Sequence, residues 1–271
     1  MNATSDARSW IERLANSRVY DLGTPLQIGM PVHPAHCPYV FTMQRRHGDT
    51  SRPGGYSSAN EVIVMSGHTG THLDGLGHIS EHGQIHGGLD AAEVQRGGKG
   101  LTANGIENVA PIVRRGVLLD VAGAEGVAVL PPDFPIDAKR AQAVAKAQGV
   151  EVRSGDAVLV RTGWMKYWSD PPAFLKTVDG QPGINADAAE WLAEVGVFLG
   201  GSETVAFEYV QPKSESLPVH LIFLVRNGIH IIEMIDLDSL ARDRVYEFGF
   251  VCAPLKFIGG TASPIRPLAL V

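Results

Sequence analysis

Three histidines and one aspartate lie within eleven residues of this chain and could hold a metal ion. Counted from His68, they stand at positions i, i+4, i+6 and i+10, as His68, His72, Asp74 and His78. Neutral imidazoles and a carboxylate are ligands that suit zinc, manganese or iron. The spacing predicts a divalent-metal site with the first three residues as ligands. His78 is then either a further ligand or a proton carrier beside the metal.

The residues around this cluster predict how the backbone presents it. The apolar run Val62–Met65, bounded by Asn60 and Gly67, predicts a short buried strand that ends where the histidines begin. Gly67 and Gly70 permit backbone conformations that larger residues resist. Thr71 can hydrogen-bond the turn or orient a ligand. We therefore expect a strand followed by a tight loop that carries all four side chains.

A second carboxylate stands in the apolar segment Ile229–Ile235. In a strand, Glu233 would share one face with three isoleucines of that segment. A carboxylate on an apolar face is costly unless it is paired or bound to a cation. Glu233 is thus predicted either to bind a metal or to form an ion pair with a buried arginine. His220, in the first turn of the preceding predicted helix, is equally compatible with a ligand and with a core histidine.

These residues predict hydrolysis by a metal-bound water. A divalent metal with open coordination positions lowers the pKa of a bound water toward about 7, and the resulting hydroxide can attack a carbonyl. His78 suits transfer of a proton to the leaving group, because imidazole changes charge near neutral pH. A serine hydrolase is the competing interpretation, but no Gly-x-Ser-x-Gly elbow is present. A non-catalytic protein that binds a small ligand, with or without a metal, is the alternative from another class.

Length and composition limit the partners. The chain has 271 residues, enough for one large domain with a sizeable core. A formal net charge of −6 without a basic run argues against nucleic acid and anionic membranes. No stretch approaches the length of a membrane span, and the amino terminus lacks the apolar core of a signal peptide. Cys37 and Cys252 are expected to be free thiols in a reducing cytoplasm.

The second half of the chain alternates strand and helix signals, which predicts an α/β fold with a mixed, twisted sheet wrapped by helices. No linker divides residues 1–271, so we expect a single domain. The helix predicted within residues 1–18 has a narrow stripe of Trp10, Ile11 and Leu14, which should pack on the body or on a second subunit. The predicted strands span residues 19–22, 117–121, 157–161, 197–199, 229–235 and 245–253, and the predicted helices 137–148, 185–195, 218–226 and 236–242.

The long loop Pro25–Gly55 is expected to be functional, because loops of this length in compact chains seldom lack a role. It contains His33, His36, Tyr39 and Phe41, which we interpret as a wall of the substrate pocket. An ordered surface loop is the alternative. After the metal-type cluster the histidine-rich region continues to residue 88, where one histidine (residue 86) could line the pocket and another (residue 82) should face solvent.

The cluster His68-x-Gly-Thr-His72-x-Asp74-x-x-x-His78 resembles the signature of the cyclase family of metal-dependent hydrolases, which includes kynurenine formamidases and isatin hydrolases. The resemblance covers roughly residues 19–240. Softer similarities lie at residues 19–23, 29–32, 117–121, 160–164 and 220–233.

The resemblance implies a β/β/α swivelling fold, a homodimer or larger assembly, and His220 and Glu233 as further metal ligands. Manganese or zinc is the expected ion. Leu76 stands where the formamidases carry proline, and the interval from His220 to Glu233 looks one residue longer than theirs. The first departure favours a cyclic amide (a lactam or an isatin-like ring) over formylkynurenine, with the arylformamidase reaction as the alternative. The second leaves the number of metal ions open.

Overall fold

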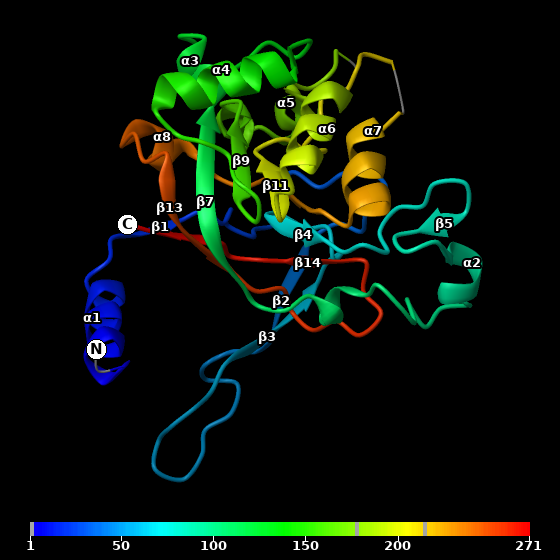
Figure 1. Cartoon of the computed structure of the whole chain (residues 1–271). Coiled ribbons are helices and arrows are strands. Elements are labelled where there is room, and N and C mark those ends of the chain that lie inside the picture. Colours follow the sequence, from blue (N-terminus) through cyan, green and yellow to red (C-terminus); the bar gives the residue numbers. More distant parts are fainter. Residues whose placement is uncertain (1–2, 177–178, 214–215) are drawn as a thin grey trace.

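A computed structural model describes residues 3–176, 179–213 and 216–271 of the chain. Its centre is a curled nine-stranded mixed sheet in the order β1-β15-β13-β7-β9-β11-β12-β4-β14 (Figure 1). Its strands are β1 Val19–Asp21, β4 His72–Asp74, β7 Ile112–Asp120, β9 Ala157–Arg161, β11 Leu199–Ser202, β12 His230–Glu233, β13 Glu247–Cys252, β14 Ala262–Pro264 and β15 Leu268–Leu270. Two-stranded ribbons pair β2 Val40–Arg45 with β3 Asn60–Val64, β5 Gln84–Ile85 with β6 Leu89–Asp90, and β8 Pro135–Ile136 with β10 Gly183–Ile184.

The helices begin and end at residues that the sequence marks as caps. Asp137 and Asn185 accept hydrogen bonds from the first turns of their helices, and Gly149 and Gly196 end these helices in left-handed conformations with φ of 71° and 81°. The α-helices are α1 Ala3–Ala15, α2 Ala91–Val94, α3 Val121–Ala124, α4 Ala138–Gln148, α5 Pro171–Phe174, α6 Ala186–Val195, α7 Pro218–His220 and α8 Asp238–Arg242. Two 3₁₀ turns, η1 Ile106–Asn108 and η2 Trp164–Tyr167, and a π-helix, η3 Leu221–Asn227, complete the set.

Two apolar layers cover the sheet, one on each face. The strands β7, β9, β11 and β12 are mutually parallel, and α4, α6 and η3 pack on one of their faces (Figure 1). Alternate residues of β7 and β9 point the other way, toward α8 and the aromatic residues of β13. The central strands are therefore buried on both faces, which explains their almost unbroken apolar sequence. The predicted mixed α/β architecture is confirmed.

A short antiparallel segment completes the sheet on the side that matters for function. β4 pairs with β12 on one side and with β14 on the other. His72 of β4 therefore has Glu233 of β12 as one cross-strand neighbour and Pro264 of β14 as the other. Neither β14 nor β15 was predicted. Each has three residues, and Pro264 has no backbone N–H to donate, so the pattern there is too weak to read.

Two expectations about burial are wrong. β3, predicted as a buried strand, has all five residues exposed, because it pairs only with β2 and projects from the body (Figure 1). The helix α1 also stands away from the body and leaves Trp10, Ile11 and Leu14 exposed. These three side chains therefore do not pack on the rest of the same chain, as had been one expectation. Packing on a second subunit remains a prediction.

Smaller differences concern boundaries. The strand predicted at residues 197–199 is β11 and begins at Leu199, the first residue in register with β9. Met234 has φ of 54°, which breaks the alternation of β12, so Ile235 packs in the opposite layer from Ile231. In the described part of the chain, no helix combines the length and the apolar character needed to cross a membrane.

Candidate metal centre

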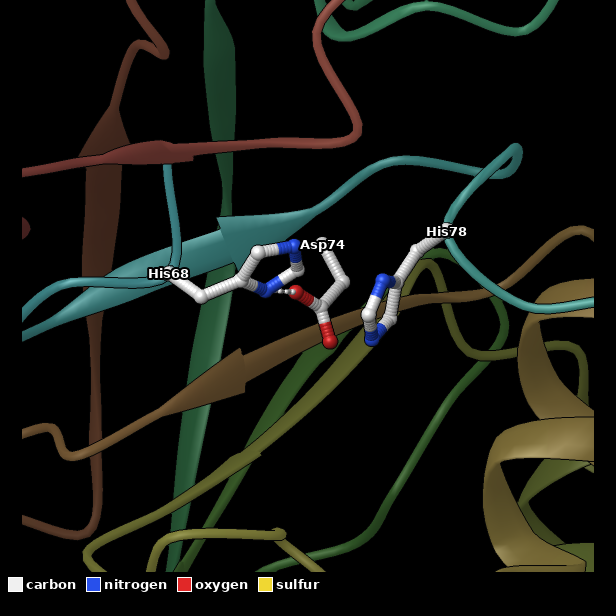
Figure 2. A group of neighbouring side chains, drawn as sticks. All are labelled: His68, Asp74 and His78. Carbon is white, nitrogen blue, oxygen red and sulfur yellow. Dashed lines mark ion pairs between the residues drawn. The ribbon is translucent and has the colours of Figure 1, made fainter. Parts of the chain in front are cut away.

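The four side chains of the histidine-rich segment meet at one end of β4. His72 and Asp74 alternate along this strand and therefore point to the same side, while His68 comes from the turn before it and His78 from the loop after it. Figure 2 shows the carboxylate of Asp74 between the rings of His68 and His78. His68 Nδ1 lies 2.9 Å from Asp74 Oδ1, and the His68 and His78 ring centres are 4.1 Å apart. The expected tight loop is thus a turn, a strand and a loop in succession.

Two glycines allow the turn before β4 to pack tightly. A Cβ atom at Gly67 would lie 2.7 Å from the carbonyl oxygen of Ala262 in β14. Gly70 has φ of 58°, and a Cβ atom there would lie 2.5 Å from the Leu26 side chain. Thr71 secures the turn from the other side, because its hydroxyl donates to the Met234 carbonyl at 2.7 Å. A larger residue at Gly67 would collide with the backbone of β14, and one at Gly70 would be strained by the left-handed backbone there.

β12 supplies a second carboxylate directly opposite His72. Glu233 Oε2 lies 3.1 Å from His72 Nε2, and Glu233 Oε1 lies 3.3 Å from His220 Nε2. The partners of Glu233 are therefore imidazoles, and the predicted alternative of an ion pair with a buried arginine is wrong. His220, at the end of α7, also points its Nε2 at Asp74 Oδ2 over 3.8 Å. All six residues named as site candidates from the sequence thus converge.

Each ligand-type histidine is held by the nitrogen that faces away from this cluster. His72 Nδ1 hydrogen-bonds to the Gly70 carbonyl at 2.8 Å, which makes Nδ1 the protonated nitrogen of the neutral ring. His68 Nε2 hydrogen-bonds to the Thr261 hydroxyl at 3.1 Å. The Gly70 carbonyl fixes both the tautomer and the ring orientation of His72, and the Thr261 hydroxyl, which can donate or accept, holds the ring orientation of His68. His72 Nε2 and His68 Nδ1 both face the cluster.

Glu208 orients the ring of His220 in the same way, and the sequence analysis did not identify this residue. Its Oε1 lies 2.6 Å from His220 Nδ1, and its two oxygens accept the backbone N–H groups of His220 and Val219 at 3.0 Å. The residue is fully buried. No spacing rule could reveal it, because the two partners lie 12 residues apart in the sequence and belong to no common motif. The only sequence signal is an acidic residue inside an otherwise apolar stretch.

The polar atoms at the centre of the cluster face one another. His72 Nε2 and both oxygens of Asp74 are buried, and their polar neighbours are other members of the cluster: Glu233 Oε2 lies 3.1 Å from His72 Nε2, and His68 Nδ1 lies 2.9 Å from Asp74 Oδ1. Two carboxylates buried side by side are costly without a cation between them. One set of three, His72, Asp74 and Glu233, and another of His68, Asp74 and His78, bring their donor atoms within 4.8 Å of one another. The residues present therefore fit a divalent metal, with Asp74 common to both sets.

The electrostatics of the cluster also favour a cation. Burial would lower the pKa values of His72 and His220, but hydrogen bonds to carboxylates outweigh it and raise them to about 9 and about 10. Burial would raise the pKa values of Asp74 and Glu233, yet the surrounding imidazoles hold both below their ordinary values. Two buried carboxylates thus draw positive charge into the site, and a divalent cation supplies that charge while displacing protons.

His78 differs from the other histidines. Burial lowers its pKa to about 4, so its ring is neutral near pH 7. It lies between the other rings, with its centre 4.1 Å from that of His68 and 6.2 Å from that of His220. A neutral imidazole there can take up a proton or bind a metal, which keeps both predicted roles open.

A cavity of about 500 Å³ opens above the cluster. Besides the metal-type residues, imidazoles and apolar side chains line it; they are His33, His36, Gln181, Val205, Ala206, Val210, Leu217 and Met234. Gln181 is held by the Phe174 carbonyl and the Val205 N–H, so it shapes the wall. His36 Nδ1, in contrast, is buried without a hydrogen-bond partner. The described lining includes no lysine or arginine.

Several residues predicted near the pocket lie elsewhere. Tyr39 packs with the aromatic cluster around Trp164, and Phe41 belongs to β2 on the projecting ribbon. His86 hydrogen-bonds to the Val225 carbonyl outside the cavity, and His82 is exposed as expected. Leu76 packs against the helical layer and does not line the cavity, so its difference from the formamidases is not a direct contact with substrate.

Comparison with known proteins identifies the family. The family model described as "Putative cyclase" matches residues 20–209. The chain belongs to the cyclase family. Isatin hydrolase of Roseibium aggregatum is 31% identical over 216 residues, which cover 77% of this chain and 73% of that protein. Kynurenine formamidase of Erythrobacter litoralis is 26% identical over 93% of both chains.

Solved structures of cyclase-family proteins have the same fold. A structure described as a novel cyclase superposes with a TM-score of 0.87 at 26% identity, covering 97% of this chain and 90% of its own. Isatin hydrolase A of Ralstonia solanacearum superposes with a TM-score of 0.72 at 25% identity, covering 100% and 98%. The resemblance read from the histidine-rich segment is thereby confirmed. It extends over nearly the whole chain, including the three-residue strands that the sequence did not reveal.

Proposed function

We propose that the protein is a metal-dependent hydrolase that cleaves the C–N bond of a small neutral amide, preferably a cyclic one such as a lactam or an isatin-like ring. The observation that carries this proposal is the cavity: four imidazoles and the Glu233 carboxylate of the candidate metal centre line one part of it, and further imidazoles and apolar side chains line the rest. The most similar relatives cited above hydrolyse amide bonds by name.

The walls favour a neutral substrate. Formylkynurenine carries an amino-acid carboxylate, which a site usually pairs with arginine or lysine. No such side chain is among the described residues of the cavity. A flat ring could instead lie between Val205, Leu217 and Met234, and one of its carbonyl groups could accept a hydrogen bond from the unpartnered Nδ1 of His36.

His68, His72 and Asp74 are proposed as the ligands of a manganese or zinc ion, with Glu233 and His220 as further ligands. Asp74 and Glu233 each direct their two oxygens toward different histidines, an arrangement compatible with one ion or two. When bound, the metal supplies Lewis acidity and lowers the pKa of water. The histidines orient their lone pairs through Gly70, Thr261 and Glu208, so the site needs little rearrangement.

His78 is proposed as the proton carrier. Its neutral ring can accept the proton that the attacking water loses and then donate it to the leaving nitrogen as the C–N bond breaks. Transfer of this proton turns the nitrogen into a better leaving group and completes the hydrolysis to an amine and a carboxylate.

The test is direct. Purified protein should contain a divalent metal and hydrolyse isatin faster than N-formylkynurenine, as followed by the loss of absorbance of each substrate. Faster turnover of N-formylkynurenine would move the assignment to an arylformamidase, which the relatives at 26% identity over 93% of the chain keep as the second candidate. Binding of either compound without turnover in metal-loaded protein would make it a non-catalytic binding protein.

We propose a cytoplasmic enzyme that acts on a small molecule, assembles as a homodimer or larger homo-oligomer, and binds neither nucleic acid nor membranes. Its net charge of −6 and the absence of a basic run support the last point. The chain has only two cysteines, Cys37 and Cys252, far apart in sequence, a composition compatible with a reducing compartment.

A further inference from the structure

A second cavity lies behind β12, on the opposite face of the sheet from the candidate metal centre. It has a volume of about 290 Å³ and is called the rear cavity here. Side chains alternate along β12, so His230 points away from Glu233 and toward the layer that contains Ile232. Among the described residues, the rear cavity shares none of its lining with the cavity above the metal centre. The side chains that line it include Leu76, Val109, Ile112, Arg114, Phe198 and His230.

His230 supplies a hydrogen-bond acceptor at the buried wall of the rear cavity. The residue is only 7% exposed, and its Nδ1 lies 3.0 Å from the Asp74 carbonyl oxygen. A carbonyl only accepts hydrogen bonds, so Nδ1 carries the proton and Nε2 of the neutral ring keeps a lone pair. Burial lowers the pKa of His230, which favours this neutral form. Nε2 bonds to no group in the described part of the chain and is therefore available to a ligand.

Arg114 supplies a cation without a carboxylate partner. Its guanidinium carbon lies 4.5 Å from the ring centre of Phe198, and it forms no ion pair with any described residue. The ring centre of Phe198 lies 5.8 Å from that of His230, so the three side chains form one group. No aspartate or glutamate is among the described residues that line the rear cavity. A guanidinium stacked on an aromatic face keeps its N–H groups for a carboxylate, which it binds through two parallel hydrogen bonds.

We propose that the rear cavity binds a small aromatic carboxylate that carries an amino or hydroxyl group. Arg114 pairs with the carboxylate, Phe198 contacts the ring, and His230 Nε2 accepts a hydrogen bond from the amino or hydroxyl group. The volume of the cavity is at the lower end of the range for small-molecule sites, which limits the ligand to a single ring. Hydrolysis of an aromatic lactam leaves an amine and a carboxylate on one molecule, so a product of the proposed reaction belongs to this class of ligand. Only this last link rests on the proposed function.

Calorimetric titration of the metal-loaded protein with 2-aminobenzoate, benzoate and aniline tests the site. 2-Aminobenzoate should bind most tightly, because it alone offers both the carboxylate and the amino group. Arg114→Gln should weaken its binding by about 10- to 100-fold, since a charge-assisted hydrogen bond is lost. The matched control is Lys139→Gln, which removes one positive charge from the exposed surface of α4. This control should bind 2-aminobenzoate as the wild type does.

His230→Asn tests the acceptor separately. The asparagine amide keeps a donor for the Asp74 carbonyl but has no atom in the place of Nε2. Benzoate has no donor for Nε2, so the variant should lose about 3- to 10-fold more affinity for 2-aminobenzoate than for benzoate. Circular dichroism of each variant must match the wild type. If His230→Asn is unfolded, Arg114→Gln and its control decide the matter.

Three results would overturn the proposal. Absence of 2-aminobenzoate binding at millimolar concentration would mean that the rear cavity is not a ligand site of this kind. Full affinity in Arg114→Gln would place the bound probe elsewhere, such as at the metal. Aniline binding as tightly as 2-aminobenzoate would remove the role of the carboxylate. None of these measurements needs turnover, so a protein that hydrolyses no amide can still confirm or refute the site.

Discussion

Around the candidate metal centre, each of three histidines makes a hydrogen bond with the ring nitrogen that points away from the cluster, and these bonds orient the donor atoms that face it. Gly70, Thr261 and Glu208 each hold one ring nitrogen and thereby direct the other one toward the cluster. Glu208 is the strongest of these partners, because it is an anion at 2.6 Å that also fixes the backbone of the ring it orients. Its removal should therefore weaken metal binding without removing a ligand.

The variant Glu208→Gln tests this at nearly constant shape. The amide oxygen can accept from only one of the two backbone N–H groups, and the charge beside His220 Nδ1 is lost, so metal affinity should fall by about 10- to 100-fold. Competition with a chelator, followed by metal analysis of the protein, measures this change. Glu190→Gln, on the exposed face of α6, is the control. An unchanged affinity would show that His220 is not a ligand or needs no partner.

His78→Ala separates a proton carrier from a ligand. If His78 only moves a proton, the variant should keep its metal while kcat falls by about 10²- to 10⁴-fold and KM changes little. Metal content and steady-state kinetics are measured on the same preparation. His82→Ala, an exposed histidine of the same region, should match the wild type. Loss of metal from His78→Ala would make His78 a ligand instead.

The candidate ligands could be predicted from the sequence because four of them lie within a single short segment. Glu233 was found because a carboxylate interrupts an apolar strand. Glu208 and Thr261 could not be found in the same way, since their roles depend on contacts between segments that are irregular or distant in sequence. Side-chain hydrogen bonds of this kind leave no periodic signal.

Among the elements, the end of β11 contains a buried carboxylate outside the metal centre. Glu203 Oε2 accepts the backbone N–H groups of Thr162 and Gly163 at 2.8 and 2.5 Å, while its Oε1 has no partner. Burial raises the pKa of Glu203 from 4.5 to about 7. The carboxyl thus holds the turn after β9 and favours its protonated form in the folded chain.

A dependence of stability on pH follows. Between pH 4.5 and about 7 the unfolded chain releases this proton before the folded one does, so ionisation of Glu203 lowers the free energy of unfolding as pH rises. Glu203→Gln removes this ionisation. The free energy of unfolding of the variant minus that of the wild type should therefore be about 2 kcal/mol larger at pH 8 than at pH 5. Urea unfolding at both pH values measures it, and the metal centre contributes equally to both proteins. An equal effect at the two pH values would refute the elevated pKa.

Elements with strong local signals were predicted well. Caps and apolar faces defined α4 and α6, and buried runs defined β7 and β9. The ribbon formed by β2 and β3 shows the limit of this reasoning. Its strands have the sequence of a buried sheet, and no local rule states whether the covering surface comes from the same chain.

On the scale of the whole molecule, a metal should link the sheet to its flanking elements. The donors come from β4, β12, α7 and two loops, so a bound ion joins segments distant in sequence. Removal of the metal should lower stability by about 4 kcal/mol if the free ion exceeds its Kd a thousandfold. Thermal unfolding with and without chelator should show a melting temperature lower by about 10 °C. Identical melting curves would mean that no structural or catalytic ion is held.

The overall architecture could be predicted partly from alternation of strands and helices and partly from family resemblance. Neither source predicted the closure of the sheet by β4 and β14, because each of these strands has only three residues. A single domain over residues 1–271 stays a prediction, although both apolar layers share the nine-stranded sheet.

The loop that lines the cavity continues directly into the ribbon formed by β2 and β3. His33 and His36 face the substrate space, and β2 begins at Val40 after a short connection. Substitutions that reshape this wall for a new substrate would therefore also shift the ribbon that follows it. During divergence of such proteins, residues of the loop should therefore covary with residues of the ribbon.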